Sequence, residues 1–142
     1  MNIQVNKSAK AYSKQEVSIN APVQKVYTVL SDINNWAKWQ GTVRKATLAG
    51  EPAVGKEFNW KAGSLSVKSK IHTANPFSEF GWTGRIWWIT AVHNWTLKEQ
   101  SGKCIVTVEE SLNGLLPGLM RKSLQEDMIQ SIKELKSTAE MN

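Results

Sequence analysis

The chain has 142 residues, a length that fits one domain with a core large enough to fold without disulfide bonds or metal ions. Its single cysteine, Cys104, excludes an internal disulfide and a cysteine-based zinc site, and its apolar neighbours predict a buried, unreactive thiol. The net charge of +6 comes mostly from scattered lysines. A positive charge suggests nucleic-acid binding, but the sequence has no basic block, no zinc-finger spacing and no arginine cluster, and we expect no nucleic-acid partner.

The N-terminal stretch lacks the features of a targeting segment. Residues 1–10 are polar and basic, without the apolar stretch of a signal peptide, and we expect a loose tail there. No apolar run in the chain reaches the length of a membrane span. The sequence therefore predicts a cytoplasmic protein without stable membrane insertion, either a monomer or a homodimer.

The first expected elements are a strand and two short helical segments. Within Ala11–Asn20, Val17 and Ile19 alternate with polar residues, which predicts a half-buried strand. From Pro22 the apolar residues follow a helical period, and a short second helical turn holds Trp36 and Trp39.

Six strands are expected next, because turn-forming residues divide the following stretch into short segments. The predicted strands are Thr42–Leu48, Lys56–Lys61, Leu65–Ala74, Glu79–Trp88, Ala91–Glu99 and Lys103–Leu112. The links between them are short, so consecutive strands pair as antiparallel hairpins.

The last stretch, Leu115–Met141, has the sustained period of an amphipathic helix. Its apolar residues recur at steps of three and four, and Pro117 suits the first helical turn. A long helix with one apolar side needs a broad apolar partner. The sequence therefore predicts an α+β fold: a curved antiparallel sheet of about seven strands wrapped around this helix, with two short helices after the first strand.

Several short motifs resemble one known group of proteins. They are Ile19-Asn20-Ala21-Pro22, Trp36-Ala37-Lys38-Trp39, Phe58-Asn59-Trp60-Lys61, Gly81-Trp82-Thr83-Gly84, Ala91-Val92-His93-Asn94-Trp95 and Glu109-Glu110-Ser111. With the order of elements, they resemble the polyketide cyclase/dehydrase and lipid-transport family over Glu16 to Ala139. That family belongs to the SRPBCC superfamily of START-related and birch-pollen-allergen-like helix-grip proteins.

The resemblance implies a single helix-grip domain over residues 1–142 with a cavity between the sheet and the C-terminal helix. It implies a carrier or sensor that binds a small hydrophobic ligand there: a lipid, an aromatic or a polyketide-like molecule. The sequence has no phosphate-binding loop, and two histidines with one cysteine do not form a metal site, so we expect no cofactor.

Strand alternation predicts which side chains face the cavity. His72 shares its strand face with lysines and is expected at the surface. The expected inner wall is aromatic and apolar, as is usual for a small-molecule site. Its sheet members are Phe58, Trp60, Val67, Ile71, Trp82 and Trp95, and its helix members are Leu119, Leu124 and Met128.

The last strand can face the cavity in two ways. Cys104, Val106 and Val108 form its more apolar set, whereas Ile105, Thr107 and Glu109 match the family register. We predict the second, which puts Thr107 on the ligand wall and Glu109 beside His93. An imidazole and a carboxylate there could transfer protons. The alternative function is therefore a cyclase- or dehydratase-like lyase or isomerase without a metal, while the structural alternative is a histidine that only satisfies a buried carboxylate.

Trp87 and Trp88 are consecutive, so in a regular strand one of them faces away from the cavity. An outward tryptophan can mark a dimer contact or a membrane-touching patch. A third interpretation is therefore a regulatory or chaperone-like protein that uses its exposed faces.

Overall fold

The computed structural model describes residues 1–115 and 118–141, without the side chains of residues 118 and 119. In chain order the elements are β1 (Ala11–Ile19), α1 (Val23–Ser31), the 3₁₀ helix η1 (Ile33–Lys38), β2 (Val43–Leu48), β3 (Glu57–Ala62), β4 (Leu65–Asn75), β5 (Glu79–Ile86), β6 (Ile89–Gln100), β7 (Lys103–Asn113) and α2 (Gly118–Ala139).

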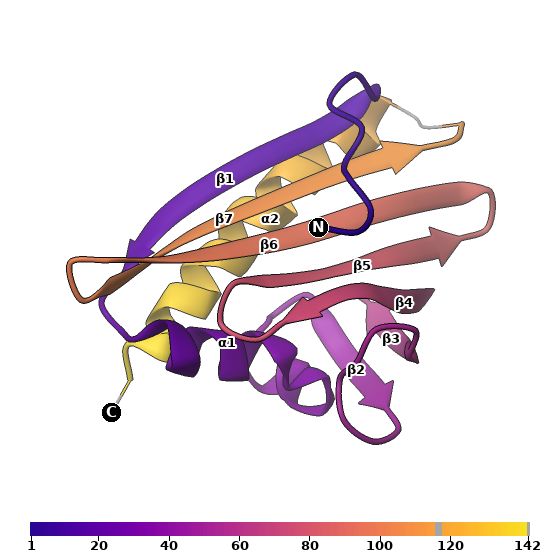
Figure 1. Ribbon diagram of the computed structural model, residues 1–142. Coiled ribbons are helices and arrows are strands. Elements are labelled where there is room, and N and C mark those ends of the chain that lie inside the picture. The colour runs from indigo at the N-terminus through magenta and orange to yellow at the C-terminus, as the bar shows by residue number, and fades with distance from the viewer. Residues whose placement is uncertain (116–117, 142) are drawn as a thin grey trace.

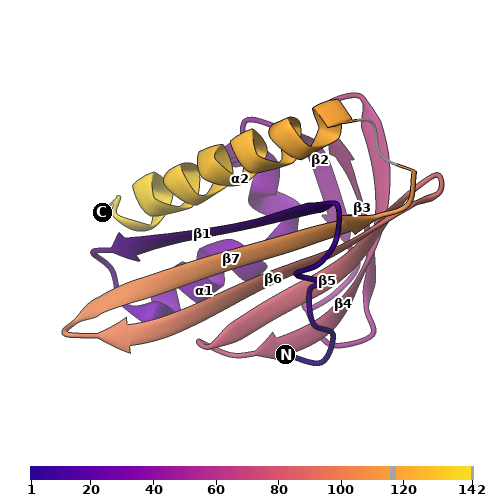
Figure 2. The ribbon, with the colours of Figure 1, turned by 90° about the horizontal axis from the view of Figure 1, so that it is seen from above.

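The strands form one antiparallel seven-stranded sheet in the order β1-β7-β6-β5-β4-β3-β2. Strands β2 to β7 are joined by hairpins. Strand β1 pairs with β7 and forms one edge of the sheet, and β2 forms the other. Helix α2 runs along the concave face and packs on β1 and α1 (Figures 1 and 2). The predicted helix-grip fold is confirmed.

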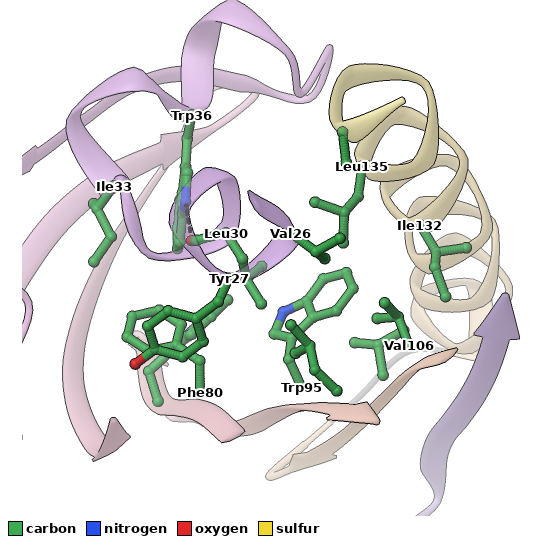
Figure 3. Close-up of a cluster of buried hydrophobic side chains, with 14 of the residues drawn as sticks. Val26, Tyr27, Leu30, Ile33, Trp36, Phe80, Trp95, Val106, Ile132 and Leu135 are labelled. Atoms are coloured by element: carbon green, nitrogen blue, oxygen red, sulfur yellow. Dashed lines mark hydrogen bonds between the residues drawn. The ribbon is translucent and has the colours of Figure 1, made fainter. Parts of the chain in front are cut away.

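The core lies between the concave face of the sheet and the helices. Figure 3 shows Ile132 and Leu135 of α2 facing Trp95 and Val106 of the sheet, with α1 and η1 closing one side. The indole Nε1 of Trp36 donates to the carbonyl of Leu30 at 2.9 Å, which fixes η1 against α1. The apolar stripe of α2 thus packs as its period predicts.

Strand β7 has the opposite face in the core from the one we predicted. Cys104, Val106 and Val108 are fully buried, and burial raises the pKa of the Cys104 thiol to about 11, in agreement with the expected unreactive cysteine. Thr107 and Glu109 point to the convex face. Thr107 donates to Glu16 at 3.0 Å, and Glu109 accepts a hydrogen bond from the Tyr12 hydroxyl.

The physical reason lies in the chemistry of the two alternating sets. Burial of Val and Cys under α2 removes apolar surface from water, whereas burial of Thr107 and Glu109 would require partners for a hydroxyl and a carboxylate. The prediction that Thr107 and Glu109 face the ligand site is therefore wrong.

Residues 1–6 lie across the convex face and do not form a loose tail (Figure 1). The backbone N–H of Asn2 donates to Thr73 Oγ1 at 2.8 Å, and Asn94 Nδ2 donates to the carbonyl of Ile3 at 2.8 Å. The amino group of Met1 forms an ion pair with Glu79 at 2.9 Å. The N-terminal segment is thus tied to β4, β5 and β6.

His72 lies beneath this segment, which corrects the expectation that it is a surface residue. It is 7% exposed, with Nε2 at 2.9 Å from Asn94 Oδ1 and Nδ1 at 2.7 Å from Thr73 Oγ1. A bulge between Ile71 and Thr73 changes the regular alternation at this point. The lysine-bearing face that we took for open surface is covered here by the chain's own N-terminal residues.

Candidate functional site

A row of directly paired residues crosses the concave face of the sheet. Glu110 on β7 is the register partner of His93 on β6, which in turn pairs with Trp82 on β5 and, through it, with Ile71 on β4. Opposite residues on antiparallel strands bring their side chains together on one face. The row therefore places a carboxylate, an imidazole and an indole side by side.

His93 is held from two directions. Its Nδ1 lies 3.2 Å from Glu110 Oε2, and the two side chains keep only 13% and 17% of their surface exposed. The Trp82 ring stacks on the imidazole with the ring centroids 4.5 Å apart and the planes 8° from parallel. The Glu110 carboxylate accepts a hydrogen bond from Nδ1–H, and in this tautomer the neutral ring has a free lone pair at Nε2.

Two polar atoms at this site have no hydrogen-bond partner among the residues that the structure describes. They are His93 Nε2 and the indole Nε1 of Trp95, both buried. Their ring centroids are 5.6 Å apart. By contrast, the indole of Trp60 donates to Ser69 Oγ at 3.0 Å. A buried polar group without a partner costs about 1–3 kcal/mol, so these two atoms retain capacity for a hydrogen bond.

The predicted apolar wall surrounds this row. Trp82 contacts both Phe58 and Trp36, at centroid distances of 6.0 and 4.9 Å. The buried members of the wall are Phe58, Val67, Ile71, Trp82, Trp95, Leu124 and Met128, while Trp60 is partly exposed. The predicted contact of Leu119 lies outside the described side chains.

Two acidic residues near His93 were not among the predicted site residues. Glu110 lies beside His93, in the place that we had assigned to Glu109. The more apolar set on β7 favoured this face, and the pairing of β7 with β6 decides it. Asp127 on α2 is the second: partial desolvation of its carboxyl group and the negative charges of Glu110 and Glu126 raise its pKa. No periodicity signal separates Asp127 from the other charged residues of the helix.

A separate open groove of about 640 Å³ lies between α1, η1 and the C-terminal half of α2. Val29, Trp39, Lys133 and Glu134 are among its lining residues, and none of the predicted ligand contacts is. Glu134 at its rim accepts a hydrogen bond from the backbone N–H of Gly41 at 2.9 Å. The row around His93 is the chemically more specific of the two places, because it combines an oriented imidazole with an aromatic wall.

The described part of the chain offers no cluster of three or more His, Cys, Asp or Glu side chains for a metal ion. None of the described helices combines the length and apolar character that crossing a bilayer requires.

The element order and the sheet topology define a helix-grip domain. Over residues 11–140 the chain matches the family described as polyketide cyclase/dehydrase and lipid transport, and it belongs to that family. No curated protein sequence matches it.

Solved structures with low sequence identity share the fold. A hypothetical protein from Helicobacter pylori superimposes with a TM-score of 0.84 at 12% identity, covering 94% of this chain and 90% of its own. A START superfamily protein from Mycobacterium smegmatis gives 0.76 at 11% identity, with 91% and 97% covered. Ara h 8.0201 gives 0.74 at 14% identity, with 92% and 98% covered.

Proposed function

We propose that this protein binds a small hydrophobic molecule with one polar group on the concave face of its sheet, beneath α2, and acts as its carrier or sensor. The observation that supports this function best is the pair of buried atoms without partners, His93 Nε2 and Trp95 Nε1, within an aromatic wall. A lipid, an aromatic or a polyketide-like molecule fits that description.

The polar group that suits both atoms is a hydroxyl. His93 Nε2 accepts a hydrogen bond when Nδ1–H is directed at Glu110, and the indole of Trp95 can only donate one. A hydroxyl group donates and accepts at once. The remaining affinity comes from burial of the ligand's apolar surface against rings such as Trp82, at about 25 cal/mol per Å², less the cost of ordering the ligand.

A pair of matched probes tests this proposal: 2-naphthol carries a hydroxyl, and naphthalene is the same ring system without it. We expect the protein to bind 2-naphthol roughly tenfold more tightly than naphthalene, as one well-placed hydrogen bond predicts. Isothermal titration calorimetry measures both affinities.

Trp95→Phe and His93→Ala should remove the preference for the hydroxyl while naphthalene still binds. Glu109→Ala is the matched control, because Glu109 neighbours Glu110 in sequence but points to the convex face. Equal affinity of the wild-type protein for the two probes, or a preference that survives in His93→Ala, would contradict the proposed site.

A second function is favoured by one specific contact. The 3.2 Å pair of His93 Nδ1 with Glu110 orients the imidazole as in a general base, with Nε2 directed away from the carboxylate. A cyclase- or dehydratase-like proton transfer could use this pair, with Glu110 in the role first given to Glu109.

Product analysis separates the two functions. The protein is purified from its own source, and bound molecules are extracted and identified by mass spectrometry beside a His93→Ala variant. For an enzyme, the variant should carry an unconverted precursor, because a general base contributes roughly 10²–10⁴ in rate. For a carrier, both proteins should carry the same molecule.

A further inference from the structure

One end of the molecule exposes a pair of tryptophans at the turn between β5 and β6. Trp87 and Trp88 are 68% and 61% exposed. Their rings stack on each other with centroids 5.8 Å apart. Large aromatic side chains at a hairpin turn remove little surface from water, so core packing does not account for them.

The backbone of this turn is also unfavourable for a tryptophan. The turn has two residues, since Ile86 pairs with Ile89, and Trp87 occupies its first central position with φ 52°. Two-residue hairpins favour glycine or asparagine at such positions, and a bulky residue with positive φ is an outlier. The choice of tryptophan therefore requires an explanation other than turn formation.

The segment that follows β7 lies at the same end of the molecule. Leu115, after β7, is 81% exposed, and its carbonyl accepts a hydrogen bond of 3.1 Å from Trp88 Nε1. A Cβ on Gly114 would lie 2.6 Å from the Trp88 carbonyl oxygen, so a residue without a side chain is needed for this approach. Trp87, Trp88 and Leu115 form one apolar tip, at the end where the β5–β6 turn and the end of β7 meet (Figures 1 and 2).

Arg85 lies beside the apolar tip, and further basic residues stand on the neighbouring β4 and in the first turns of α2. Arg85 donates from Nε to the carbonyl of Trp87 at 3.4 Å, and Lys68 is its register partner on β4. Arg121 and Lys122 lie in the first turns of α2, and all four side chains are exposed. The sequence contains no acidic residue from 80 to 98 or from 111 to 125, and of the four cations Lys122 pairs with Glu126 at 3.9 Å. The tip therefore combines apolar rings with nearby cations.

We propose that the apolar tip docks on the surface of an anionic lipid bilayer. Tryptophan favours the interface between acyl chains and water, and basic residues gain about 1 kcal/mol each near anionic headgroups. Three exposed side chains offer far less than the roughly 800 Å² per partner of a stable protein interface, and two chains of net charge +6 repel each other. A bilayer takes up the rings and attracts the cations, whereas a second copy would bring like charges together.

The apolar tip is separate from the ligand site, and β6 connects the two. Along β6 only Thr90, Ala91 and Val92 separate Ile89, at the turn, from His93. Docking of the tip would therefore bring the His93 end of the concave face toward the bilayer.

Vesicle flotation tests the docking surface directly. The probes are vesicles of phosphatidylcholine with phosphatidylserine, and vesicles of phosphatidylcholine alone. We expect the wild-type protein to bind the anionic vesicles more tightly, and Trp87→Ser with Trp88→Ser to reduce the partition coefficient at least about tenfold, since burial of one large ring accounts for about that factor. Val54→Ser is the matched control, because Val54 is 59% exposed outside the tip.

Charge reversals separate the contribution of the cations. Arg85→Glu with Arg121→Glu should weaken binding to anionic vesicles by about fivefold per residue, whereas Lys98→Glu with Lys103→Glu, in the β6–β7 hairpin, should change it little. Trp87→Gly should raise the melting temperature, because glycine suits the turn, and still weaken vesicle binding, so that loss of binding is not confused with unfolding.

Unchanged flotation of the double tryptophan variant would overturn the proposal. So would equal effects of the two pairs of charge reversals. A tryptophan-dependent dimer in analytical ultracentrifugation, without vesicle binding, would also overturn it and assign the tip to self-association.

Discussion

His72 and His93 lie on opposite faces of the same sheet and differ in what their ring nitrogens meet. Both nitrogens of His72 have side-chain partners, in Asn94 and Thr73. His93 has one, in Glu110, and its Nε2 has none among the described residues. The first histidine is therefore part of a satisfied structural cluster, while the second retains bonding capacity for an occupant.

The surroundings of His72 predict a pH-dependent stability. Burial lowers the pKa of His72 below its ordinary value of 6.5. The unfolded chain therefore takes up a proton near pH 6.5 that the folded chain still excludes, so the free energy of unfolding should fall as the pH drops through this window, by up to about 1.4 kcal/mol per pH unit.

Thermal melting followed by circular dichroism measures this dependence between about pH 5 and about pH 8. His72→Gln should flatten the curve in that range. The ion pair of Glu79 changes the stability only at lower pH. Its pKa is lowered from 4.5, so its stabilising effect is present throughout this range and is lost as the pH falls further. An unchanged slope in His72→Gln would show that another group titrates.

At the scale of elements, β7 shows how one strand divides its two faces between different tasks. Its apolar residues pack under α2, while Thr107 and Glu109 bond to β1 on the convex side. The same alternation carries Glu110 to the concave face beside His93. A shift of register by one residue would exchange all of these contacts at once.

Helix α2 depends on its apolar stripe for stability. Leu135 is fully buried, so we expect Leu135→Ala to lower the free energy of unfolding by about 2–5 kcal/mol, from lost burial and the cavity left behind. Chemical denaturation measures the change. Lys133→Ala, at an exposed position two residues away, is the control and should stay within about 0.5 kcal/mol of the wild type. A comparable loss in both variants would show that the burial of Leu135 is not the source of the effect.

At the scale of the whole molecule, the sheet is covered on both sides, by α2 on the concave face and by residues 1–6 on part of the convex face (Figure 1). Gly81 lies under this cover, where a Cβ would stand 2.7 Å from both Asn94 Oδ1 and the His72 ring. The N-terminal segment thus closes a compact polar cluster that a regular sheet face would leave open.

Removal of residues 1–5 tests the role of this cover. The truncated chain loses the hydrogen bonds at Asn2 and Ile3 and the ion pair of Met1, and we expect a loss of about 2–4 kcal/mol in the free energy of unfolding. Because His72 becomes accessible to water, the pH dependence of the melting temperature should also become weaker. A truncated protein that keeps the pH profile of the full chain would show that water already reaches this cluster.

The order of elements, the antiparallel hairpins and the packing side of α2 were predictable from the sequence. Hydrophobic period and turn residues are local properties, and they identified Leu124, Met128 and the aromatic wall around Trp82 on the correct face. The position of His93 on the concave face followed from the same alternation.

Three features were decided only by the tertiary structure. The face that β7 turns to α2 depends on its partners on β1 and β6, so the choice between Glu109 and Glu110 could not be read from β7 alone. The burial of His72 requires a bulge in β4 and the N-terminal segment, which lies about seventy residues away in sequence. The apolar tip joins a hairpin turn to the end of β7. Local periodicity determines what each segment can bury, but contacts between distant segments determine which of its side chains meet.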